Sequence, residues 1–88
     1  MTVTVKTLDT NTFEVSVTGR SSTTHIVTVP AEDAARLTGG KVATEYLVKR
    51  SFDFLLEREP NTSILRSFEL SVIGRYFPEY ERVIKGML

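Results

Sequence analysis

The chain has no cysteine, no tryptophan and a single histidine. Without cysteine it can form no disulfide, thiolate nucleophile or cysteine metal site. One histidine leaves a zinc ion without the further imidazole or thiolate ligands that most protein sites supply. These absences remove common catalytic and metal-binding arrangements, so we expect no cofactor and no enzymatic activity.

Neither sign of charge is in excess, because eleven basic residues balance eleven acidic ones. Nucleic-acid-binding proteins usually carry a positive excess, since neutralising phosphates supplies much of their affinity. The balance therefore disfavours nucleic acid as a partner without excluding a local basic face. No run approaches the roughly 18 apolar residues of a membrane-spanning helix, and MTVTVKTLD lacks the apolar segment of a signal peptide. We expect a cytoplasmic protein that does not enter a membrane.

The length of 88 residues indicates one domain, 1–88. Within residues 1–30, apolar side chains at Phe13, Val15 and Val17 alternate with polar ones, which is the period of a half-buried strand. Similar runs lie on either side, separated by turn signals rich in Asp, Asn, Gly and Ser. We predict a three-stranded antiparallel β meander over 1–30, with one polar face.

Residues 31–88 have the character of a helical part. Pro30 ends the sheet and suits the start of a short helix, which Gly39-Gly40 then ends. The main helix is predicted over 42–58. The fold class that follows is α+β, in which an N-terminal three-stranded antiparallel sheet is packed by one long helix and several short C-terminal helices.

The apolar arc of the predicted main helix is wider than one sheet face requires. Either the C-terminal helices or a partner chain must cover the rest of it. Pro60 and Pro78 divide the C-terminal third into short segments, and Asn61, Thr62 and Ser63 are suitable caps for a helix after Pro60.

Three C-terminal stretches carry a family resemblance. They are FLLEREP at 54–60, SILRSF at 63–68 and VIGRYFPEYE at 72–81. Together they resemble the signature of a family of short, uncharacterised bacterial proteins, over roughly residues 23–84. The resemblance implies a bacterial, cytoplasmic, single-domain protein. It carries over no activity and no functional residue.

Candidate catalytic groups are few. His25 lies in the third predicted strand, where we expect a half-exposed ring with a structural role. Asp53 and Glu57 fall on the solvated side of the main helix, so we interpret them as hydrated surface rather than an acid–base pair. Gly39-Gly40-Lys41 follows a helix rather than a strand and lacks the spacing of a phosphate loop.

The main helix and the C-terminal aromatics favour a non-enzymatic interaction or regulatory module. Its mechanism would be the burial of apolar side chains left uncovered by the fold, with a homodimer or another protein as the partner. The contact candidates are Phe52, Leu56, Tyr76 and Phe77.

The alternative is a small DNA-binding regulator. Residues 63–77 could form a helix-turn-helix-like segment, and the cations would come from Arg66, Arg75 and Arg82. Against this interpretation, both helices would be short, and the second is mostly apolar, whereas a helix that reads bases needs polar side chains.

Overall fold

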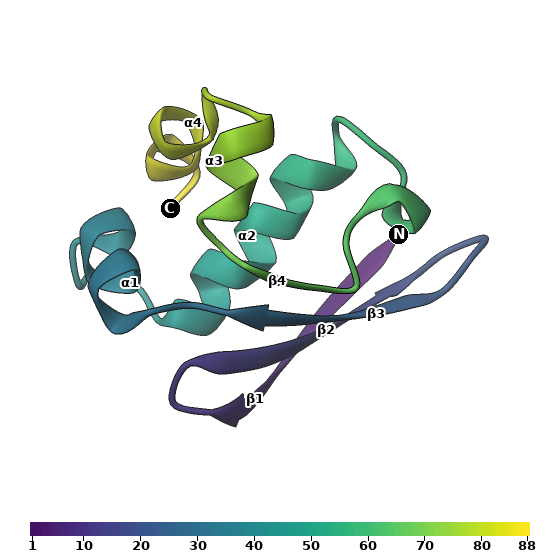
Figure 1. Cartoon of the computed structure of the whole chain (residues 1–88), viewed down its shortest axis with the longest axis horizontal. Helices are drawn as coiled ribbons and strands as arrows, with labels where there is room; N and C mark the ends of the chain where they lie inside the picture. Colours follow the sequence, from purple (N-terminus) through teal and green to yellow (C-terminus); the bar gives the residue numbers. More distant parts are fainter.

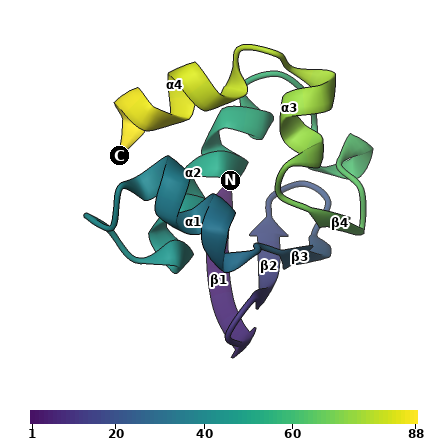
Figure 2. The same cartoon turned by 60° about the vertical axis from the view of Figure 1, so that its left-hand side comes forward.

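A four-stranded sheet with helices on one side makes up the protein, as seen in the computed structural model, which describes all 88 residues (Figures 1 and 2). The elements in chain order are β1 (Thr2–Asp9), β2 (Thr12–Thr18), β3 (Thr23–Thr28), α1 (Ala31–Thr38), α2 (Thr44–Leu56), the 3₁₀ turn η1 (Asn61–Ser63), β4 (Ser67–Glu69), α3 (Val72–Tyr76) and α4 (Tyr80–Met87). The α+β class and the N-terminal sheet packed by helices are confirmed.

The sheet is mixed rather than purely antiparallel. Its order is β1-β2-β3-β4, and the first three strands form the expected antiparallel meander. The fourth strand, β4, pairs in parallel with β3, Phe68 lying beside Val27. Its three residues are too few to show a period of two, so the sequence pattern did not reveal it.

The register places the apolar residues of the meander on one face. Val15 pairs with Val5, Val17 pairs with Val3, and Phe13 pairs with Val27. This face is buried under α2, over which α4 packs in turn, while the Thr- and Ser-rich opposite face has no helix over it (Figure 1). Burial of the apolar side chains is the main stabilising contribution.

The first helix begins and ends where the sequence predicts, and α2 covers Thr44–Leu56 within the predicted 42–58. α1 follows Pro30 and ends at Gly39, whose φ of 62° is left-handed and whose N–H donates to the Ala35 carbonyl. The wide apolar arc of α2 is covered largely from within the chain, because α4 packs against both α1 and α2. No helix has the length and apolar character needed to cross a membrane.

One predicted helix is absent. After Pro60 the chain makes only the turn η1 and then enters β4, so 63–77 contains a strand and one five-residue helix rather than two helices. The reason lies in tertiary hydrogen bonds. The Ile26 N–H donates to the Arg66 carbonyl at 2.8 Å, and the Leu70 N–H donates to the Thr28 carbonyl at 3.0 Å. Pairing with β3 overrides the local helix preference.

Candidate functional site

An apolar groove of about 430 Å³ lies between the end of α2, the segment around η1, β4 and α3. Eight of its ten lining residues are hydrophobic. The lining consists of Leu55, Glu59, Ser63, Ile64, Leu65, Phe68, Val72, Ile73, Tyr76 and Phe77. Its volume is within the range of pockets that bind ligands or side chains.

The groove has exposed apolar groups and one unpaired charge. Leu65 is 49% exposed and Tyr76 is 68% exposed, although both are large hydrophobic residues. Glu59 is the only charged lining residue, and no Lys, Arg or His nitrogen lies within 4 Å of its carboxylate. The groove therefore suits an apolar group with a cation beside it.

A buried polar network anchors the η1 side of the groove to β3. The His25 Nδ1 lies 2.7 Å from the Leu65 carbonyl, and its Nε2 lies 2.8 Å from the Thr23 hydroxyl. The Asn61 amide donates to the Thr23 hydroxyl at 3.0 Å and to the Ser21 carbonyl at 2.7 Å. The segment that carries Leu65 is thus held by the His25 ring and the Ser21 carbonyl, each about 40 positions earlier in the sequence than its partner.

The donors and acceptors of this network determine the histidine tautomer. A carbonyl can only accept, so the His25 Nδ1 carries the proton that it donates to Leu65. In the neutral tautomer of the ring, Nε2 accepts from the Thr23 hydroxyl, whose oxygen accepts from Asn61. No buried side-chain polar atom lacks a partner. The ring is 0% exposed rather than half-exposed as expected, because His25 lies on the same face of β3 as the buried Thr23 and Val27. Its role in the structure is to position the groove wall.

The end of α2 is joined to the start of α4 by Arg58. Its guanidinium carbon lies 3.5 Å from the centroid of the Phe54 ring, and Nε donates to Glu79 at 3.3 Å. The pKa of the Glu79 carboxyl is lowered by a hydrogen bond from its own backbone N–H, with a further contribution from Arg58. Phe54 in turn meets Phe77 edge to face at 5.9 Å, which supports the α3 side of the groove.

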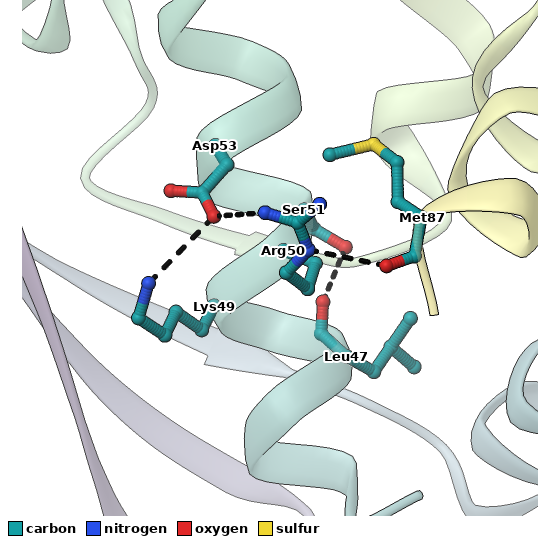
Figure 3. Close-up of polar contacts among 6 residues, drawn as sticks. All are labelled: Leu47, Lys49, Arg50, Ser51, Asp53 and Met87. Atoms are coloured by element: carbon teal, nitrogen blue, oxygen red, sulfur yellow. Dashed lines mark hydrogen bonds and ion pairs between the residues drawn. The ribbon is translucent and has the colours of Figure 1, made fainter. Parts of the chain in front are cut away.

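A second hollow, of about 410 Å³, lies beside β1 and contains Leu56. Its charged groups are largely satisfied by each other (Figure 3). Arg50 donates to Asp53 at 2.8 Å and to the Met87 carbonyl at 3.2 Å, and Lys49 approaches the same Asp53 carboxylate at 3.7 Å. Of the charged residues that line this hollow, only Glu57 has no ion-pair partner.

The four contact candidates therefore lie in different places. Tyr76 and Phe77 line the groove, and Leu56 lines the second hollow. Phe52 is 0% exposed, so its assignment as a surface contact is wrong. It is enclosed between the rings of His25 and Phe68, at 5.3 and 6.1 Å.

The predicted contacts do not include the groove residues Leu65, Val72 and Ile73. They come together because β4, rather than a helix, follows η1 and leads into α3. A conspicuous signal was the density of apolar residues between Pro60 and Pro78.

The three arginines of the DNA-binding alternative come from separate elements. Arg66 precedes β4, Arg75 is in α3 and Arg82 is in α4. All three are exposed, and none takes part in an ion pair. The helix-turn-helix-like segment predicted over 63–77 is not formed. No group of three or more His, Asp or Glu residues is placed to hold a metal ion.

Tyr80 gives the protein a testable pH dependence. Its hydroxyl is buried and donates to Ser51 Oγ at 2.7 Å, and burial raises its pKa from 10.0 to about 12. The unfolded chain therefore loses this proton near pH 10, while the folded protein keeps it to about pH 12. Stability is retained below pH 10 and falls by about 2 to 3 kcal/mol as the pH rises through this window.

Urea denaturation across the same pH range measures this effect. Tyr80→Phe should show a smaller decline, whereas Tyr76→Phe, which changes an exposed tyrosine, should decline like the wild type. An unchanged decline in Tyr80→Phe would contradict the assignment.

Comparisons with protein-family models, with curated proteins and with solved structures return no match. The family resemblance noted from the C-terminal motifs stays a prediction.

Proposed function

We propose that the protein is a non-enzymatic interaction or regulatory module that binds an apolar protein segment in the groove. The observation that carries the proposal is the coincidence of an apolar lining with two large exposed side chains, Leu65 and Tyr76, at one place. Exposed apolar patches on small domains commonly mark protein interaction sites. The cytoplasm of a bacterium is the setting proposed for this role, on the strength of the cysteine-free sequence and the motif resemblance.

The chemistry of the groove defines the segment that it would accept. Apolar side chains would displace water from Leu65 and Tyr76, while a neighbouring Lys or Arg would meet Glu59. The buried network behind Leu65 holds one wall in place, so less ordering is needed on binding. DNA binding is not carried forward as a second function, because 63–77 lacks its expected first helix.

Peptide titration followed by methyl NMR tests the proposal. The probes are short capped peptides with Leu or Phe at alternate positions and one Lys. We expect saturable shifts of the Leu55, Ile64 and Ile73 methyl signals. Val72→Glu, which places a charge in the lining, should abolish them.

Two matched variants sharpen this titration. Thr24→Glu, on the exposed face of the sheet, should bind like the wild type. Glu59→Gln should weaken the Lys peptide by about two- to fivefold and leave a Lys-free peptide unchanged. If no probe shifts the groove methyls, or if Val72→Glu binds equally well, the proposed function is wrong.

A further inference from the structure

We propose that a second copy of this chain pairs with the free edge of β4, joining the two sheets across a twofold axis so that the two grooves adjoin. This inference rests on the proposed function, because it identifies the partner beside the groove as a second copy of the same chain. The protein would then be a homodimer.

The backbone of β4 has an open side. The Arg66 carbonyl and the Leu70 N–H are bonded to β3, so these residues direct their backbone groups toward that strand. Backbone groups alternate in direction along a strand, so Ser67 and Glu69 direct theirs toward the edge. No turn or loop hydrogen bond uses the backbone of either residue. An unpaired edge of this kind is a template for another strand.

The edge is complementary to itself in one antiparallel register. Ser67 of one copy lies opposite Glu69 of the other, and the two Phe68 residues face each other at the axis. The outward groups of Ser67 and Glu69 then form hydrogen-bonded pairs, and the Phe68 residues form the closer, non-hydrogen-bonded pair. The two Glu69 carboxylates do not lie opposite each other, so the register avoids a like-charge pair.

This register brings the two grooves together. Phe68 pairs with the inward-facing Val27 and lines the groove, so facing Phe68 residues would place the two apolar linings beside the axis. In the same register the exposed Arg66 of one copy lies opposite Leu70 of the other, next to Glu69. Neither Arg66 nor Glu69 takes part in an ion pair, so unpaired charges of opposite sign lie along the same edge.

The other free edge of the sheet, β1, is less suitable for pairing with a second copy. It is the longer strand, but the hollow beside it contains Arg50 and Asp53, which are already paired with each other. β4 combines an open backbone edge with exposed apolar groups and unpaired charges of both signs. β1 therefore serves as the control surface.

Sedimentation velocity from micromolar to millimolar concentration tests the association. We expect a concentration-dependent dimer. Ser67→Pro removes an N–H directed at the open edge while leaving the bonds to β3, and proline is tolerated at such edge positions. This variant should remain folded by circular dichroism and sediment as a monomer. A wild type that stays monomeric throughout would overturn the inference.

Disulfide trapping tests the register and does not depend on the proline variant. The wild type has no cysteine, so Ser67→Cys and Glu69→Cys chains can be mixed without background. A hydrogen-bonded antiparallel pair has Cα atoms about 5.5 Å apart, which a disulfide can span. We expect the mixed disulfide to form about tenfold faster than either symmetric one. Thr4→Cys on β1 should not cross-link. Equal rates, or faster trapping through Thr4→Cys, would contradict pairing at β4.

The outcomes separate this inference from the proposed function. A monomer whose groove methyls still shift with apolar peptides would leave the groove function standing and exclude the second copy. A β4 dimer that Val72→Glu does not weaken, with no peptide binding, would support edge pairing and exclude the groove function. The absence of both effects would exclude both.

Discussion

Phe52→Ala is expected to lower the free energy of unfolding by about 3 to 5 kcal/mol. Phe52 is 0% exposed, and its ring packs between those of His25 and Phe68. Alanine would leave a cavity between the sheet and α2 that the surrounding rings cannot fill. Small domains have only about 5 to 15 kcal/mol of stability in total, so much of it would be lost. Urea denaturation of the purified variant measures the change.

Leu56→Ala is the matched control for this substitution, because Leu56 lies one turn further along α2 and is only partly buried. It should cost less than about 2 kcal/mol, since part of the side chain is already in contact with water. Equal losses in the two variants would mean that Phe52 is not the core residue described above.

His25→Ala is expected to cost about 3 to 4 kcal/mol and to loosen the groove wall selectively. The substitution leaves the Leu65 carbonyl without the His25 donor, removes one of the two partners of the Thr23 hydroxyl, and opens a cavity beside Phe52. The Ile26 N–H donates to the neighbouring Arg66 carbonyl, so its hydrogen exchange should accelerate more than that of amides in β2.

His25→Phe separates the two parts of this effect. It retains a ring of similar size but removes both hydrogen bonds, so about half of the loss should remain and the Ile26 amide should still exchange faster. Thr24→Ala, an exposed neighbour, should change stability by less than about 0.5 kcal/mol. An Ile26 amide that keeps its full protection in His25→Phe would show that the network does not hold the wall.

The meander could be predicted from the sequence because its signal is local. Alternation at Phe13, Val15 and Val17 reports directly which face is buried, and the Gly39-Gly40 stop corresponds to two residues with positive φ. Patterns of this type depend only on neighbours along the chain, so a single sequence contains them.

The groove could not be predicted in the same way. Its wall depends on bonds from His25 to Leu65 and from Asn61 to Ser21, each across about 40 positions. Nothing local to 63–69 favours a strand over a helix until β3 supplies hydrogen-bond partners. The burial of Phe52 could not be predicted for the same reason, because it depends on Phe68 in β4, a strand that the sequence pattern does not reveal.

The parallel pairing of β4 also has a consequence for the order of folding. Short turns connect the strands of the meander. The pairing of β3 with β4 instead joins residues 26–28 to residues some forty positions later in the chain. Closing the longer loop carries a larger entropic cost and slows the contacts that depend on it. We expect the hairpins to assemble early and the β4 docking step to come late. On the ribosome, a nascent meander would expose its apolar face and the free edge of β3 until α2 and β4 have been synthesised and can cover them.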